Sequence, residues 1–149
     1  MDSSSSWIVV LAIYGAVVST GLLVLRILEQ VWVSVSTSFV PSSGTTPPEV
    51  VLRVGNRGRK TAQVTQLALS GHGSVSIPLE AELIVKGPKL PVKFDGLESE
   101  SWHVDANELK KRLTETGWGY EVRGVATLDT GQRVWESIHR FTRVGQPER

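Results

Sequence analysis

The sequence contains no cysteine, and this excludes several kinds of chemistry. Without thiols the chain can form no disulfide, no zinc–thiolate site and no cysteine nucleophile. A basic excess is also missing, because 16 Lys and Arg are balanced by 15 Asp and Glu, for a formal net charge of +1. Dedicated nucleic-acid binders carry a strong positive excess, so we expect no nucleic-acid partner.

Motifs for nucleotide binding or hydrolysis are missing as well. No P-loop, G-x-G-x-x-G or G-x-S-x-G pattern occurs. The histidines, His72, His103 and His139, are not paired with another ligand at helical spacing, so we expect no metal and no cofactor. His103 and Asp105 form the one pair from which a scattered enzyme site would be built. We expect them only to share a strand face, and we predict a non-enzyme without a small-molecule substrate.

The sequence does contain one long uncharged run, the 19 residues from Trp7 to Leu25. As a helix it would be about 28 Å long, close to the ~30 Å hydrocarbon thickness of a bilayer. A buried helix in a soluble fold would need apolar partners on every side, more than the remaining chain can readily supply. We therefore predict a transmembrane helix over 7–28, after a short polar N-terminus, 1–6.

A cleaved signal peptide is the alternative reading of this segment. Such peptides have a basic start, a shorter apolar core and a small-residue cleavage site. The sequence instead begins MDSSSS, and the polar exit is Arg-Ile-Leu-Glu-Gln. We expect the segment to remain as the single anchor of a cell-membrane protein.

The orientation of the anchor follows from its flanking charges. No Lys or Arg precedes the run, whereas Arg26 follows it closely and Arg53, Arg57, Arg59 and Lys60 come later. The positive-inside rule then favours a cytoplasmic C-terminal domain. Only one of these cations is close in sequence, so the extracytoplasmic orientation stays open.

Small residues recur within the predicted span, with Gly15 and Ser19 four residues apart. Small faces allow transmembrane helices to approach each other closely. Gly15 and Ser19 are therefore a candidate helix-packing face. The alternative is that small residues are ordinary in membrane spans.

The remaining chain reads as short alternating strands separated by turns. Residues 31–40 place valines on one face and serines on the other, and apolar positions alternate again in 49–56 and 61–71. Glycine in Asp129-Thr130-Gly131 is typical of a hairpin turn. We predict an all-β fold, an antiparallel sandwich over 31–143, followed by a flexible tail, 144–149.

One short helix is predicted inside this all-β pattern. Asp105 suits the N-cap, Glu108 would complete a capping box, and Gly117 suits the position just past the end. Leu109 and Leu113, four residues apart, would form its buried stripe.

Two features offer surfaces for recognition. Arg57, Arg59 and Lys60 could contact anionic headgroups or a partner, or be only a solvated hairpin tip. Trp118, between two glycines, is a candidate interface aromatic, with helix-to-strand packing as the alternative. Trp102 and Trp135 lie in strand-like runs, and we expect both to pack in the core or between the sheets.

Three stretches, VVLRVGNRGRK, LPVKFDGLESESWHV and VRGVATLDTGQRVWES, together resemble an immunoglobulin- or fibronectin-type sandwich. More narrowly, the chain is similar to uncharacterised small bacterial and phage proteins that combine one transmembrane helix with such a domain. This resemblance implies an Ig-like fold and carries no activity. The inter-sheet cysteines of antibody domains are absent.

These observations predict a membrane-anchored domain that acts by binding, with the lipid bilayer and an unidentified protein as partners. The alternative is a small accessory subunit that joins a larger membrane complex through its transmembrane helix.

Overall fold

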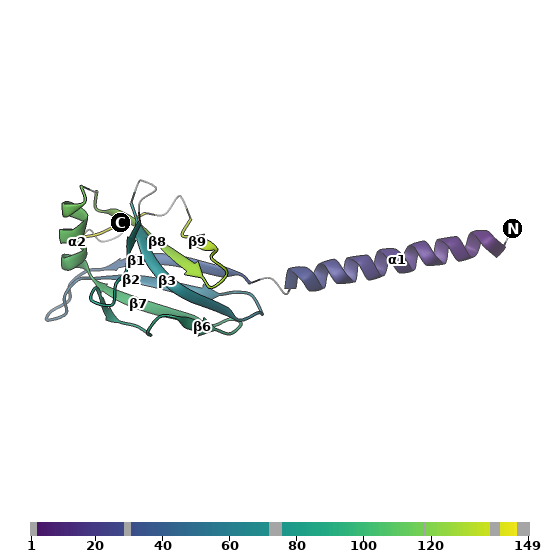
Figure 1. The fold of residues 1–149 in the computed structure, drawn as a ribbon, viewed down its shortest axis with the longest axis horizontal. Helices are drawn as coiled ribbons and strands as arrows, with labels where there is room; N and C mark the ends of the chain where they lie inside the picture. The colour runs from purple at the N-terminus through teal and green to yellow at the C-terminus, as the bar shows by residue number, and fades with distance from the viewer. Residues whose placement is uncertain (1–2, 29–30, 72–75, 118, 138–140, 146–149) are drawn as a thin grey trace.

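A computed structural model describes residues 3–28, 31–71, 76–117, 119–137 and 141–145. The chain forms a long N-terminal helix followed by two mostly antiparallel sheets with a second, short helix (Figure 1). The predicted antiparallel β architecture, with an apolar helix before it, is confirmed at this level. His72, Trp118 and His139 lie outside the described residues.

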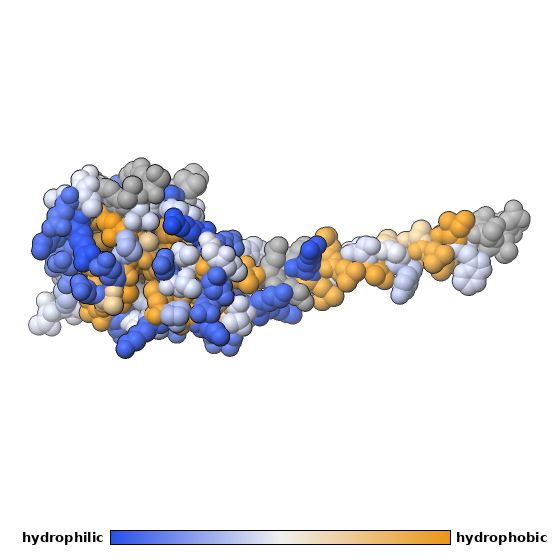
Figure 2. Space-filling view, viewed as in Figure 1, coloured by the Kyte–Doolittle hydropathy of each residue, from blue (hydrophilic) through white to orange (hydrophobic). Residues whose placement is uncertain are grey.

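The first helix, α1 (Ser3–Leu28), extends away from the sheets, and apolar side chains cover much of its surface (Figures 1 and 2). Its Trp7–Arg26 stretch is long and apolar enough to cross a membrane, and none of it is buried by the rest of the protein. A signal sequence has the same length and composition, so the helix alone fits either role. The polar serines expected to precede the helix form its first turn.

One sheet has the strand order β1-β2-β7-β5, all antiparallel. The β1–β2 pair runs in register from Val33 opposite Asn56 to Val40 opposite Glu49. The strands are β1 (Val33–Val40), β2 (Glu49–Asn56), β7 (Ser99–Asp105) and β5 (Ile84–Lys86).

The other sheet has the order β10-β8-β3-β4, with β6 also paired to β3 and β9 to β8. Its strands are β10 (Thr142–Arg143), β8 (Glu121–Leu128), β3 (Ala62–Ser70), β4 (Ser76–Pro78), β6 (Val92–Phe94) and β9 (Arg133–Trp135). The predicted hairpin joins β8 to β9, and Gly131 has φ +81 in its turn.

The hydrophobic core lies between the two sheets and takes apolar side chains from both. Trp102 of β7 is fully buried, as expected, and meets Phe94 edge-on with ring centroids 6.2 Å apart. The sheets approach each other closely at Gly124 of β8. A Cβ added there would overlap the Leu52 methyl group of the facing sheet, so only glycine fits this contact.

A β-bulge explains the apolar pattern of β3. The register with β8 shifts between Val64 and Gln66. The extra residue changes the alternation, so that Val64 and Leu67, three apart, are both buried, followed by Leu69.

The short helix, α2 (Ala106–Glu115), lies at the end of the sheets opposite to α1 (Figure 1). Asp105 caps it as predicted, accepting hydrogen bonds from the N–H groups of Asn107 and Glu108. Leu109 and Leu113 are fully buried. The backbone N–H of Asp105, which a complete capping box would pair with Glu108, donates instead to a carbonyl of the preceding loop, that of Leu83.

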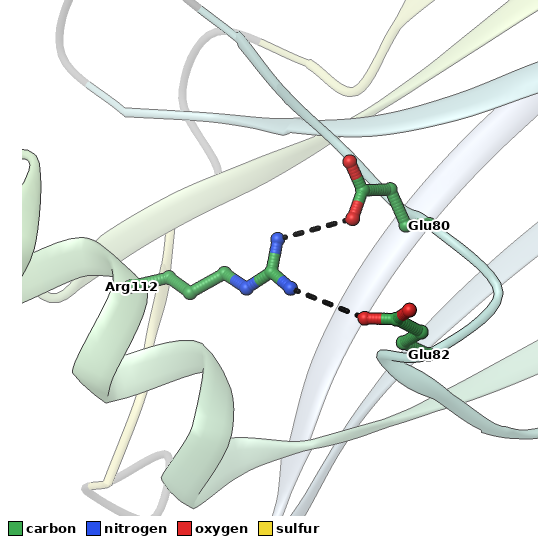
Figure 3. Close-up of polar contacts among 3 residues, drawn as sticks. All are labelled: Glu80, Glu82 and Arg112. Atoms are coloured by element: carbon green, nitrogen blue, oxygen red, sulfur yellow. Dashed lines mark hydrogen bonds and ion pairs between the residues drawn. The ribbon is translucent and has the colours of Figure 1, made fainter.

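An ion-pair cluster fastens α2 to the loop between β4 and β5. Arg112 of the helix lies between two carboxylates, 3.3 Å from Glu80 and 4.0 Å from Glu82 (Figure 3). Exposed pairs of this kind contribute at most about 1 kcal/mol, so the two buried leucines hold the helix more strongly than this cluster does.

The segment after the β8–β9 hairpin places one tryptophan differently from the prediction. β9 ends at Trp135, and the next residue, Glu136, turns its side chain into the protein. Trp135, expected to pack inside, is 36% exposed, and the guanidinium of Arg123 lies 4.7 Å from its ring centroid. The prediction for Trp135 was wrong because its neighbour Val134 packs against the core, so strand alternation turns Trp135 to the outer face of its sheet, beside Arg123.

Candidate functional site at the helix-proximal end

The basic residues singled out in the sequence lie at the end of the sheets where β1 begins, the helix-proximal end. Antiparallel pairing places Asn56, the last residue of β2, opposite Val33, the first of β1. The loop that follows β2, residues 57–61, therefore lies at this end. Its Arg57 N–H donates to the carbonyl of Trp32 at 2.6 Å.

This hydrogen bond limits the distance between α1 and residues 57–61, here called the basic loop. The helix ends at Leu28, and Trp32 is four residues further on. Four extended residues reach at most about 14 Å. Arg57, Arg59 and Lys60, about 30 positions from the helix in sequence, are thus brought close to its end, and all three side chains are exposed.

The side chain of Asn56 stabilises the basic loop through hydrogen bonds to its backbone. Its buried amide donates to the carbonyl of Lys60 at 2.7 Å and to that of Phe94 at 3.3 Å, while its Oδ1 accepts from the N–H of Gly58 at 3.0 Å. One side chain therefore satisfies backbone groups of two segments. The turn falls between the predicted strand segments 49–56 and 61–71, and the structure adds that it is tied to a second loop.

The second loop, residues 95–98, joins β6 to β7. The backbone of Asn56 accepts from Leu97 N–H and donates to the Glu98 carbonyl, both at 2.8 Å. Gly96 lies so close to the first loop that an added Cβ would be 2.9 Å from the Gly58 carbonyl oxygen. Leu97 has a left-handed backbone, φ 69, and its side chain is 84% exposed.

The two loops differ in how their charges are used. Within the described part of the chain, the side chains of Arg57 and Arg59 make no hydrogen bond or ion pair. The acids of the second loop serve its own structure, since Asp95 accepts from the Thr61 hydroxyl at 2.9 Å and Glu98 from the Asp95 N–H at 2.8 Å. These neutral donors leave both carboxylates charged, so exposed cations in the first loop face acids in the second.

A shallow groove of about 380 Å³ begins beside the basic loop, on the outer face of β1, β2 and β7. Arg53 crosses it and donates to the Ser99 hydroxyl at 2.9 Å. Gly55, which has no side chain, leaves space at the bottom of the groove. The lining is Ser34, Ser36, Arg53, Gly55, Asn56, Arg57, Leu97, Glu98 and Ser99. Reading the sequence did not group these residues, because they come from three strands and two loops.

The histidine selected from the sequence has a partner that the sequence did not suggest. His103 Nδ1 lies 2.6 Å from Glu49 Oε2, a contact produced by the antiparallel pairing of β2 and β7. Asp105, the expected neighbour, uses its carboxylate to cap α2 instead. In the described residues no group of three or more His, Asp or Glu side chains is placed to hold a metal ion.

The predicted helix-packing face lies on α1, which makes no contact that buries it. A Cβ added at Gly15 would meet no atom within 4 Å. Beside this stripe, a shallow hollow is lined by Ala16, Thr20 and Gly21 together with two valines. The Thr20 hydroxyl donates to the Ala16 carbonyl at 2.8 Å, so its polar group is satisfied within the helix.

Comparisons of the chain with protein-family models, with curated proteins and with solved structures found no match. The functional argument therefore rests on the helix, the two sheets and the residues at the helix-proximal end.

Proposed function

We propose that the protein is a single-pass membrane protein whose β domain acts as a binding module at the bilayer surface. The apolar and unburied α1 supports the anchor, because its Trp7–Arg26 stretch finds no apolar partner among the other described residues. The bilayer supplies that partner. The domain has its own core, separate from the helix, and presents strand faces and loops to other molecules.

The observation that carries this proposal is the hydrogen bond between Arg57 and Trp32. It ties the first residue of the basic loop to Trp32, which lies within about 14 Å of the helix end. The headgroup layer on each side of the hydrocarbon is about 5–8 Å thick, and charges act over a Debye length of about 8 Å at physiological salt. Arg57, Arg59 and Lys60 are therefore within range of the lipid headgroups.

We further propose that the domain is Ig-like. Constant-type immunoglobulin domains have the strand order A-B-E-D in one sheet and C-F-G in the other. With β1 as A and β2 as B, β7 as E and β5 as D, the first sheet follows this order. With β3 as C and β8 as F, the short β9 and β10 share the place of G. The buried tryptophan lies on β7, whereas antibody domains carry it on strand C.

The same loop supports a cytoplasmic domain. The cytoplasmic leaflet is anionic, and each nearby cation contributes about 1 kcal/mol of attraction. Arg26 lies at the end of the span, and pairing of β1 with β2 adds Arg57, Arg59 and Lys60 on the same side of the span. An extracytoplasmic domain would place these cations at the less anionic leaflet.

The absence of cysteine allows a direct test of anchor and orientation. Ser4→Cys and Ser43→Cys are made separately, position 43 lying exposed between β1 and β2, and intact and lysed cells are treated with a membrane-impermeant thiol reagent. In intact cells, the proposal expects labelling at position 4 alone. Labelling at 43 alone would reverse the orientation. A mature protein that lacks residue 4 would show that the segment is a cleaved leader.

A second candidate function is that of a small accessory subunit that joins a membrane complex through α1. The small-residue stripe and the hollow at Ala16, Thr20 and Gly21 favour it, because neither is covered by the rest of the described chain. Exchanging α1 for an unrelated membrane helix separates the candidates. Partner recovery by crosslinking would persist if the β domain binds the partner and would be lost if α1 does.

A further inference from the structure

The groove between Arg53 and Arg57 presents two guanidinium groups, which membrane anchoring through α1 does not require. We propose that it binds the phosphate group of an anionic phospholipid in the leaflet beside which the β domain sits. The inference rests on the proposed anchoring, because only an anchored domain keeps this end at the headgroups. It goes further by assigning a particular site and a particular ligand group.

The position of the groove favours a membrane ligand. Arg57 lines it and is hydrogen-bonded to Trp32 of the segment that leaves α1. The groove thus begins at the helix-proximal end and runs along the strands away from it. A tethered site experiences a high effective concentration of any group in the adjacent layer, so even weak headgroup contacts would be occupied.

Two guanidinium groups supply the positive charge that a phosphate requires. Arg53 is held across the groove by its hydrogen bond to Ser99, which leaves the other guanidinium N–H groups available. Arg57 is exposed and makes no ion pair in the described part of the chain. Arginine binds phosphate oxygens in a bidentate manner, and two arginines at one groove suit a phosphodiester.

The rest of the lining agrees with this ligand. The Ser36 side chain adds a hydroxyl donor for phosphate or headgroup oxygens, whereas the Ser34 hydroxyl donates to the Gly55 carbonyl at 3.4 Å. Glu98 also lines the groove, and its carboxylate keeps its negative charge while it accepts the N–H of Asp95 at 2.8 Å, so the two guanidinium groups outnumber one acid there. The volume of about 380 Å³ lies in the range of about 300–1,000 Å³ typical of small-ligand sites.

Apolar side chains at the same end distinguish a lipid from a soluble phosphate. Leu97 stands at the rim with 84% of its surface exposed, and Trp32 is 68% exposed on the segment next to Arg57. Tryptophan is favoured at membrane interfaces. A free phosphate has no apolar part to place against these side chains, whereas a lipid headgroup at the bilayer surface brings apolar material close to both.

The test uses the full chain in lipid nanodiscs, with the single substitution Leu97→Cys carrying an environment-sensitive, apolar fluorophore. Discs contain phosphatidylcholine alone or with phosphatidylglycerol, plus a nitroxide-labelled lipid as quencher. We expect stronger quenching and a blue shift in the anionic discs. The double substitution Arg53→Gln with Arg57→Gln should abolish this difference. The loss of each cation should lower the ratio of docked to undocked domain about fivefold.

A matched control removes two exposed cations away from the groove, Lys86→Gln with Lys89→Gln, and should keep the difference. The fluorophore at Ser43→Cys, beyond the far end of β1, should stay unquenched in both discs. Equal signals at position 97 in the two discs, or equal effects of the two double variants, would overturn the inference. So would a response to glycerol 3-phosphate in neutral discs without a response to phosphatidylglycerol. Recovery of the chain with the discs reports the anchor separately.

Discussion

The carboxylate of Glu136 accepts a hydrogen bond from the backbone N–H of Thr37 at 2.8 Å, across 99 positions of sequence. Its second oxygen accepts from the N–H of Gly124 at 3.0 Å. Glu136 is only 3% exposed, so this one side chain joins β1 of the first sheet to β8 of the second inside the protein. The break after β9 places it there.

Glu136→Ala should lower the free energy of unfolding of the β domain by about 2–4 kcal/mol, because it leaves two buried N–H groups without acceptors. Chemical denaturation of the full chain in detergent, followed by tryptophan fluorescence, measures this. Glu115→Gln, an exposed acid at the end of α2, is the control and should change stability by less than about 0.5 kcal/mol. Equal effects of the two substitutions would show that the buried carboxylate does not join the sheets.

Asn56→Ala should destabilise the helix-proximal loops, because the Lys60 and Phe94 carbonyls and the Gly58 N–H all lose their side-chain partner. We expect a loss of about 2–3 kcal/mol. Hydrogen exchange should show faster exchange at Gly58.

Two further variants sharpen this prediction. Asn56→Asp keeps the acceptor for Gly58 but faces two carbonyls with a carboxylate, so it should not rescue the loops. Asn107→Ala, an exposed asparagine at the start of α2, should leave them unchanged. Unaltered exchange at Gly58 in Asn56→Ala would contradict the role given to this residue.

Asp105→Ala should weaken α2 by about 1 kcal/mol, the usual contribution of an N-cap. Asp105→Asn keeps an oxygen acceptor for the Asn107 and Glu108 N–H groups and should restore most of that stability. Thermal unfolding of both variants provides the comparison. If the alanine and asparagine variants unfold alike, the carboxamide does not replace the cap and the assignment is wrong.

Gly124→Ala should destabilise the domain by about 1–3 kcal/mol, because the new methyl group would overlap Leu52 and lie 2.8 Å from the Thr37 hydroxyl oxygen. Adding Leu52→Val should recover part of the loss by removing volume at the contact. Gly119→Ala, with no neighbouring atom within 4 Å, is the matched control. A double variant less stable than the sum of both single effects would argue against a steric cause.

Local patterns in the sequence were sufficient for much of the fold. The uncharged run from Trp7 predicted α1, and the alternation in β1 and β2 predicted both strands with their buried faces. The end signals of α2 lie within one helical turn of each terminus. These features follow from interactions between residues at most four apart, or from their regular spacing, so the sequence alone contains them.

The candidate site could be predicted only in part. Arg57, Arg59 and Lys60 were found because they are neighbours in sequence, but Arg53 and Leu97 were not connected with them. Leu97 reaches the site because β6 and β7 return the chain to the same end as β2. Such a return depends on which strands pair, and no spacing along the chain reports it.

Sequence by itself thus determined an apolar helix, alternating strands, a capped helix and a cysteine-free chain of nearly balanced charge. Only the tertiary structure decided the bulge in β3, the exposure of Trp135 and the contacts of His103 with Glu49 and of Glu136 with Thr37. It also decided that Arg57 lies beside Trp32. The physical reason is that hydrogen bonds between distant segments depend on strand order and register, whereas helix caps and apolar periodicity act within a few residues.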